Sequence, residues 1–222
     1  YVFHLAAQSL VRRSYDNPYE TYSTNVLGTL NVLECVNDLS SVRSVVIVTS
    51  DKCYENDESN KAFVESDRLG GHDIYSSSKA CAEILTSSFR RSFFDSRKQP
   101  LCATVRAGNV IGGGDWSTDR LLPDIMVAAS KGSPVKIRNP QSVRPWQHVL
   151  EPLSGYLMLG LGLGQGKKEW AHSWNFGPDE SDCVTVDEVC KIVREYWPGI
   201  QFEYVKETGK HEAKLLRLNA EQ

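Results

Sequence analysis

Short apolar runs alternate with amphipathic segments along the first half of the chain. Residues 1–7 (YVFHLAA), 44–50 (SVVIVTS) and 101–112 (LCATVRAGNVIG) are nearly continuous apolar runs, which are typical of parallel strands covered on both faces. Residues 17–39 and 75–94 instead repeat apolar side chains every three or four positions, which predicts two helices. The order strand, helix, strand, helix, strand predicts an α/β fold with a doubly wound parallel sheet of Rossmann type.

The first predicted helix has a recognisable start. Asn17 can cap it, Pro18 suits its first turn, and Glu20 lies where a capping box places its acid. The apolar stripe that would face the sheet consists of Val26, Leu30, Leu33 and Val36.

The pattern becomes irregular after about residue 112. We therefore expect residues 1–112 to be the C-terminal part of the Rossmann-type domain and residues 113–222 to form mainly a smaller C-terminal α/β substrate-binding lobe. The elements expected in this second half are helices at 119–132, 153–163 and 185–197 (the last opened by a capping box of Thr185 and Glu188), and strands at 134–139, 171–177, 201–206 and 214–222. The glycines of GLGLGQGKK at 160–168 resemble a phosphate loop, but no Ser or Thr follows the lysines and no strand precedes them, so a helix end is the better interpretation.

Composition excludes several classes of function. The 222 residues are 41% hydrophobic and 24% charged, as in soluble globular proteins, and the net charge of −3 argues against a nucleic-acid or membrane-surface role. The longest apolar run, at 156–163, is too short to cross a bilayer. None of the six cysteines forms a zinc-type pair, and we expect them to be small buried side chains in a reducing, cytoplasmic compartment.

Polar residues gather where the three predicted strands end. The first strand runs into Ala6, Ala7 and Gln8, the second ends in Thr49–Ser50–Asp51–Lys52, and the third ends near Arg106 and Asn109. In a doubly wound sheet these ends lie at one edge, where ligands bind. Taken alone, the Thr49–Lys52 segment could equally be an ordinary turn with an Asx cap.

Tyr75 and Lys79 lie one turn apart on the second helix, which begins beside this edge. A lysine ammonium near a phenol favours the phenolate, and would lower the Tyr75 pKa from about 10 toward neutrality. The phenolate could then take a proton from a sugar or alcohol hydroxyl. An exposed Tyr and Lys at this spacing also arise by chance, so the pair gains weight only from its neighbours.

Together these motifs resemble the extended short-chain dehydrogenase/reductase family, and within it the nucleotide-sugar 4,6-dehydratases. The resemblance covers nearly the whole chain and rests on HLAAQ, TSDKCYEN, GGHDIYSSSKACAE, RAGNVIGGGDW, DRLLPD, RPWQHVLEPLSGY and WNFGP. It implies dehydration of a nucleotide sugar with bound NAD: oxidation at carbon 4, loss of water across carbons 5 and 6, and reduction at carbon 6.

The resemblance also implies catalytic roles. Tyr75 would take the proton from the carbon 4 hydroxyl, Lys79 would hold the nicotinamide ribose, and Ser50 would hydrogen-bond the oxygen at carbon 4. Asp51, as a carboxylic acid in a dry pocket, would protonate the departing hydroxyl. Lys52 stands where the dTDP-glucose enzymes have a glutamate base for carbon 5; the lysine fits the CDP-glucose branch and leaves the carrier of that proton open.

The remaining expectations follow from the same resemblance. The cofactor-binding residues would be Leu5, Ala6, Ala7, Asn25, Thr49, Tyr75 and Lys79, and the substrate-binding residues Gln8, His72, Asn109, Arg120 and Arg144. The arginines could instead simply pair with acids at the surface. A homodimer would form through helices 18–39 and 75–94. The glycine-rich turn that holds the NAD pyrophosphate is missing, so we expect a fragment that lacks this turn before Tyr1 and lacks the C-terminal end of the protein.

Two alternatives remain open. One is another dehydratase or an epimerase for a different nucleotide sugar, although an epimerase needs neither the acid at Asp51 nor a group at Lys52. The other is a non-catalytic dinucleotide-binding sensor, although such proteins usually lose the tyrosine or the lysine. No metal site is expected.

Overall fold

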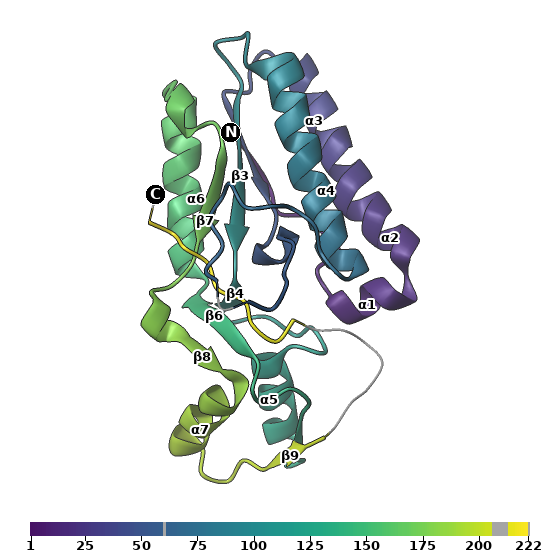
Figure 1. The fold of residues 1–222 in the computed structure, drawn as a ribbon, viewed down its shortest axis with the longest axis vertical. Helices are drawn as coiled ribbons and strands as arrows, with labels where there is room; N and C mark the ends of the chain where they lie inside the picture. Colours follow the sequence, from purple (N-terminus) through teal and green to yellow (C-terminus); the bar gives the residue numbers. More distant parts are fainter. Residues whose placement is uncertain (60, 206–212, 222) are drawn as a thin grey trace.

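The computed structural model describes residues 1–59, 61–205 and 213–221 of the chain (Figure 1). Four parallel strands form the main sheet in the order β1-β2-β3-β7. They are β1 (Val2–His4), β2 (Ser44–Val48), β3 (Leu101–Ala107) and β7 (Ser173–Phe176). This sheet confirms the predicted α/β fold and brings the carboxyl ends of the strands to one edge.

Helices cover both faces of the sheet. On one side, α3 (Gly28–Asp38) and α4 (Ile74–Phe89) lie next to each other, and α6 (Leu150–Gly164) covers the other side (Figure 1). Side chains of strand β2 pack against the helices on both faces of the sheet, because successive side chains point to opposite faces. Val45 and Ile47 pack with residues of α3 and α4, whereas Val46 packs with residues of α6. The nearly continuous apolar strands in the sequence follow from this double coverage.

The first predicted helix is interrupted. It is divided into α2 (Pro18–Tyr22), a π-helical turn η1 (Ser23–Leu27) and α3, and a short helix α1 (Val11–Asp16) precedes it. Asn17 makes no side-chain cap hydrogen bond, so the predicted cap is wrong. Glu20 binds Arg13 instead, with 2.6 Å between the Arg13 guanidinium and the carboxylate, because α1 brings the arginine within reach.

The third predicted strand divides at Gly108. Strand β3 belongs to the main sheet, but β4 (Asn109–Ile111) joins a second sheet in the order β4-β6-β8. A Cβ at Gly108 would lie 2.4 Å from the Pro145 ring, so only a glycine fits at this point of the chain without a shift. The other strands of this half are β6 (Val143–His148), β8 (Cys183–Thr185), β5 (Val135–Ile137) and β9 (Phe202–Tyr204).

Helices α5 (Leu121–Ser130) and α7 (Val186–Tyr196) complete the second half, packing with β5 and β9 around Ile125, Val135 and Cys190. The predicted capping box of Thr185 and Glu188 is confirmed. The remaining short elements are η2 (Asp51–Cys53), η3 (Arg90–Phe94), η4 (Lys168–Trp170) and η5 (Glu180–Asp182). The division at residue 112 stays a prediction, but α6 and β7 pack on the first sheet although they follow this position.

Three further predictions concern the C-terminal segment, the glycines at 160–164 and the cysteines. The predicted strand at 214–222 is wrong over its described part, which makes only isolated bridges through Leu215 and Leu218. The glycines at 160–164 lie in α6, as expected for a helix end rather than a phosphate loop. All six cysteines are free; Cys53, Cys102 and Cys190 are buried as expected, whereas Cys81 and Cys183 are half-buried and Cys35 is exposed.

Neither a membrane-spanning helix nor a metal-binding cluster is present in the described residues. No helix in residues 1–59, 61–205 and 213–221 is both long and apolar enough to span a bilayer. In the same part of the chain, no group of three or more His, Cys, Asp or Glu side chains is arranged to hold a metal ion.

Candidate active site

The turn after β2 gathers three of the predicted catalytic residues. Ser50 caps the short helix η2, and its hydroxyl accepts from the Lys52 backbone N–H at 3.3 Å. The same hydroxyl donates to Asp51 Oδ1 at 3.0 Å, and Lys52 Nζ lies 3.1 Å from this carboxylate oxygen. Asp51 is fully buried, and no residue in the described part of the chain forms a hydrogen bond with its Oδ2. One carboxylate oxygen is therefore held by its neighbours, and the other is a buried acceptor whose hydrogen bonding is unsatisfied.

The start of α4 places Tyr75 against this turn. Asp73 caps the helix by accepting from the Ser76 N–H at 2.9 Å, and Ser14 accepts from the Tyr75 N–H at 3.1 Å. The phenol is buried and lies close enough to Ser50 and Asp51 for both side chains to affect its pKa. The predicted grouping of Tyr75, Ser50 and Asp51 is thus present in the structure.

The ionisation of Tyr75 differs from the prediction. Burial raises the pKa of Tyr75 to about 12, and the nearby Asp51 charge raises it too, although the hydrogen bond to Ser50 and the Arg120 charge act in the opposite direction. The predicted lowering by Lys79 is therefore wrong for the protein alone. The reason is geometric, because the Lys79 ammonium donates to the Val48 carbonyl at 3.1 Å.

Lys79 lies one turn beyond Tyr75 and is also buried. Burial lowers the pKa of Lys79 to about 8, although the negative charge of Glu83 partly opposes the shift. The ammonium uses one of its three donors on Val48, and within the described part of the chain no further acceptor binds it. Two N–H groups therefore remain for a ligand beside Tyr75.

The loop after β1 is tied to α4 through Asn25. The Asn25 amide accepts from the Gln8 backbone N–H at 2.8 Å and donates to the Ser78 hydroxyl at 2.9 Å. Asn25 lies in η1, and π-helical turns of this kind often occur at functional sites. The Gln8 side chain binds Thr21 and Leu10, which fixes the loop shape. The predicted cofactor residues Leu5, Ala6 and Ala7 follow β1 directly, at the carboxyl edge of the sheet.

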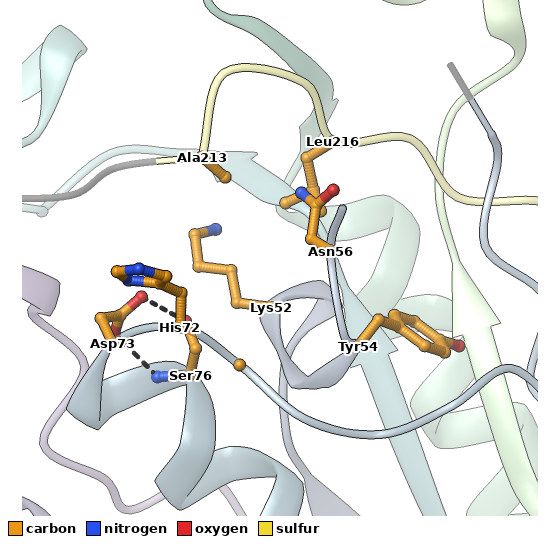
Figure 2. A pocket seen from close by; sticks show the side chains of 9 residues that line it. Lys52, Tyr54, Asn56, His72, Asp73, Ser76, Ala213 and Leu216 are labelled. Carbon is orange, nitrogen blue, oxygen red and sulfur yellow. Dashed lines mark hydrogen bonds between the residues drawn. The ribbon is translucent and has the colours of Figure 1, made fainter. Parts of the chain in front are cut away.

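Lys52 also lines a pocket (Figure 2). The Lys52 amine extends between His72 and Asp73 on one side and Asn56 on the other. Ala213 and Leu216 border it from the C-terminal segment. His72 and Lys52 thus line the same pocket, and the substrate role of His72 stays a prediction.

The predicted phosphate ligands occupy different surroundings. Arg120 binds Asp115 at 2.7 Å and Ser9 at 2.8 Å, close enough to Tyr75 to affect its pKa. The Asn109 side-chain oxygen is buried, and none of the described residues forms a hydrogen bond with it. Arg144 donates to the backbone carbonyls of Val143, Ala213 and Lys214. In this structure Arg144 holds the segment that borders the pocket.

Sequence reasoning missed a buried polar network beneath the site. Thr49, predicted as a cofactor residue, donates its hydroxyl to Glu83 and to the Val105 carbonyl. Glu83 also forms an ion pair with Arg106 at 2.7 Å. A signal was available, because Glu83 follows Tyr75 and Lys79 at helical spacing on the same face of α4.

Comparison with known proteins assigns the family. The family model described as GDP-mannose 4,6 dehydratase matches residues 1–161. The chain belongs to this family. It is 48% identical to CDP-glucose 4,6-dehydratase of Salmonella typhimurium over 98% of the chain and 62% of that protein. It is also 26% identical to dTDP-glucose 4,6-dehydratase of Haemophilus influenzae, over 89% of the chain and 59% of the relative. The chain thus spans about three fifths of the length of these relatives.

Solved structures share the fold of this family member. UDP-N-acetylglucosamine 4-epimerase from Methanobrevibacter ruminantium superimposes with a TM-score of 0.84 at 20% identity, over 100% of this chain and 68% of that one. DesIV, a dTDP-glucose 4,6-dehydratase from Streptomyces venezuelae solved with NAD bound, gives a TM-score of 0.82 at 23% identity, over 98% of this chain and 64% of that one.

Proposed function

We propose that the complete protein is an NAD-dependent 4,6-dehydratase, a hydro-lyase, that converts CDP-glucose to CDP-4-keto-6-deoxyglucose. The observation that carries the reaction class is the Ser50–Asp51–Lys52 turn facing Tyr75, because water elimination needs an acid that an epimerase does not need. The choice of CDP-glucose is supported by the 48% identity to the Salmonella enzyme of that name.

The residues present fit the nicotinamide-ribose half of NAD. The two N–H groups of Lys79 that no described residue accepts are suited to the ribose hydroxyls, and Leu5, Ala6 and Ala7 line the same edge of the sheet. A bound NAD would supply the hydride acceptor for carbon 4 and the hydride donor for carbon 6, and its positive nicotinamide ring would favour ionised Tyr75. Asn25 then keeps the loop after β1 in register with α4.

Tyr75 and Ser50 act at carbon 4. Tyr75 takes the proton of the carbon 4 hydroxyl, while Ser50 hydrogen-bonds the resulting oxygen. The high pKa of Tyr75 in the protein alone keeps the phenol protonated until positive charge is brought beside it. The new ketone makes the proton on carbon 5 acidic, which prepares the elimination.

Asp51 and Lys52 act on carbons 6 and 5. Asp51 protonates the departing hydroxyl through Oδ2, which no described residue binds, and Lys52 takes the proton from carbon 5. Elimination therefore takes one proton from Asp51 and adds one to Lys52. Lys52 Nζ lies 3.1 Å from Asp51 Oδ1, so the proton can pass back to Asp51 before the next turnover.

The substrate and partner assignments extend this proposal. Arg120, Arg144 and Asn109 would bind the nucleotide diphosphate, with His72 and Gln8 near the sugar. Arg144 would have to release the backbone carbonyls that it binds in this structure. A homodimer through helices 18–39 and 75–94 is supported by the exposed Tyr19, Leu27, Ile84 and Phe93 on these segments. Sedimentation of the complete protein as a monomer would contradict the dimer. We expect the complete protein to be located in the cytoplasm.

Mass spectrometry in heavy water tests the activity. The complete protein is incubated with NAD and CDP-glucose, with dTDP-glucose in parallel. Loss of one water with gain of one solvent deuterium on CDP-glucose alone is the expected result. Turnover of dTDP-glucose instead would overturn the nucleotide assignment, and no mass change with either sugar, despite bound NAD, would overturn the dehydratase.

A further inference from the structure

Helix α4 carries a buried carboxylate that the proposed reaction does not use. Glu83 is 2% exposed and follows Lys79 by one turn. Its Oε1 accepts from the Thr49 hydroxyl, and its Oε2 accepts from Thr104 at 2.7 Å, Ser173 at 3.2 Å and Arg106 Nη2 at 2.7 Å. These four donors lie on or directly after β2, β3 and β7, so a single carboxylate joins α4 to three strands of the main sheet.

Arg106 connects Glu83 to two further residues, Tyr54 and Glu65. Its Nη1 donates to the Tyr54 hydroxyl at 2.8 Å and to the Glu65 carbonyl at 3.0 Å, and the guanidinium also lies over the Tyr54 ring. Both charged side chains are almost completely buried. A buried ion pair is weak evidence for stability, because desolvation opposes the attraction, and replacement of the whole pair by apolar residues is often tolerated. A role in positioning therefore needs separate support.

That support is the connection of the ion pair to residues next to Ser50 and Lys79. Thr49, held by Glu83, precedes Ser50 in the turn that contacts Tyr75. Val48, just before Thr49, supplies the carbonyl that accepts from Lys79. Glu83 and Lys79 therefore hold Thr49 and Val48, two adjacent residues at the end of β2, against successive turns of α4.

We propose that Glu83 is a positioning residue for the dehydratase reaction, holding α4 on the strand ends so that Lys79 and Tyr75 keep their places relative to Ser50. This inference rests on the proposed function and deepens it. Glu83 touches neither substrate nor cofactor in this role and acts through Thr49 and Lys79.

The charge of Glu83 adds an electrostatic effect that can be measured. Burial lowers the pKa of Lys79, and Glu83 opposes that shift. The other titratable groups facing Lys79 are Cys53 from η2, whose thiol pKa is raised well above its ordinary value by burial, and His4 from β1, whose pKa is lowered by burial and by Lys79 itself. Glu83 is thus a nearby carboxylate that raises the pKa of Lys79 against the effect of burial.

The test uses E83Q in the complete protein loaded with NAD. The glutamine retains the shape of the side chain but removes its charge, so we expect the alkaline limb of the kcat/KM profile with CDP-glucose to move down by about one pH unit. The titration midpoint of Lys79, followed by NMR of labelled lysine and assigned with K79R, should move down with it. A side chain that only stabilised the fold would lower activity at every pH without moving either value.

Three further variants keep the test decisive. T104V removes a donor to the same carboxylate but leaves its charge, so its alkaline limb should stay in place. E83D keeps the charge on a shorter side chain, so kcat should fall at least tenfold with the limb unmoved. E83Q/R106Q removes both charges and replaces E83Q if the unpaired arginine prevents folding.

The outcomes separate this proposal from the proposed function. A folded E83Q or double variant with an unmoved limb and an unmoved Lys79 midpoint would overturn the electrostatic role, and E83D with normal kcat would overturn the positioning role. If the wild-type protein does not dehydrate CDP-glucose, the proposed function fails. The lysine titration still decides whether Glu83 governs Lys79, because it requires no sugar substrate.

Discussion

Replacing Asp51 by asparagine should separate the two halves of the proposed reaction. The Oδ1 atom of an asparagine can still accept from Ser50 and Lys52, which lie 3.0 and 3.1 Å from the present carboxylate oxygen. The change falls on Oδ2, the buried oxygen that no described residue binds, which becomes an amide that cannot supply an acidic proton. The perturbation is therefore chemical, with little change in shape.

The expected magnitude follows from the loss of one general acid. Proton transfer by a placed side chain contributes roughly 10²- to 10⁴-fold to a rate, equivalent to about 3–5 kcal/mol in the barrier to water loss. Oxidation at carbon 4 depends on Tyr75 and Ser50, which the substitution leaves in contact. We therefore expect D51N to form the 4-keto sugar at a near-normal rate and then to stop.

The assay follows reduced nicotinamide by its absorbance after mixing the complete protein with NAD and CDP-glucose. In the wild type the reduced cofactor should appear briefly, whereas in D51N it should accumulate toward one equivalent per site and persist. Asp57, exposed and in the loop following η2, offers the matched control, since D57N should behave as the wild type. Release of the 4-keto-6-deoxy sugar by D51N at the wild-type rate would refute the assignment of Asp51 as the acid.

Three other predictions concern the site and its scaffold. Y75F should retain NAD but lose at least 100-fold in kcat, because the proton acceptor at carbon 4 is gone; turnover near the wild-type rate would exclude Tyr75 from that role. G155A should lower the free energy of unfolding by about 1–3 kcal/mol in urea denaturation, because a Cβ there would lie 2.0 Å from the Phe176 ring, whereas G113A, with no atom within 4 Å, should be neutral. The pKa of Lys79 is about 8 in the folded protein and 10.5 ordinarily. Between pH 8 and pH 10.5 the unfolded state therefore binds more protons than the folded state. Wild-type stability relative to K79M should therefore rise from about pH 8 to pH 10, by up to about 3 kcal/mol, and a flat difference would contradict the burial of a charged lysine.

Local patterns in the sequence predicted much of the fold. The strands 44–48 and 101–107, the helix at 74–89 and the capped helix at 186–196 were recognisable because periodicity and capping residues depend only on near neighbours. Asn17 shows the limit of such signals. Its predicted cap is absent because α1 ends directly before it, and an interruption of this kind depends on packing by distant residues.

The site was predictable to the same degree. The strand-end rule correctly brought Ser50, Asp51 and Tyr75 together, since the order of elements alone determines which ends meet. The ionisation of Tyr75 could not be predicted, because it depends on how deeply the phenol is buried and on where the Lys79 ammonium points. Glu83 and Arg106 lie 23 positions apart in the sequence. Local spacing predicts contacts only between near neighbours, so it could not predict this ion pair.

The continuous segment from β3 through Gly108 to β4 has a mechanical consequence. The two strands belong to different sheets, and no loop separates them that could absorb a rotation. Because a side chain at position 108 would collide with Pro145, the angle between the sheets is set by backbone packed against backbone and ring. Any tilt of the second sheet must therefore move the end of β3, and with it the Val105 carbonyl that holds Thr49. The alignment of the two halves is a property of one stiff stretch of chain, and a bulkier residue at 108 would misalign the whole edge at once.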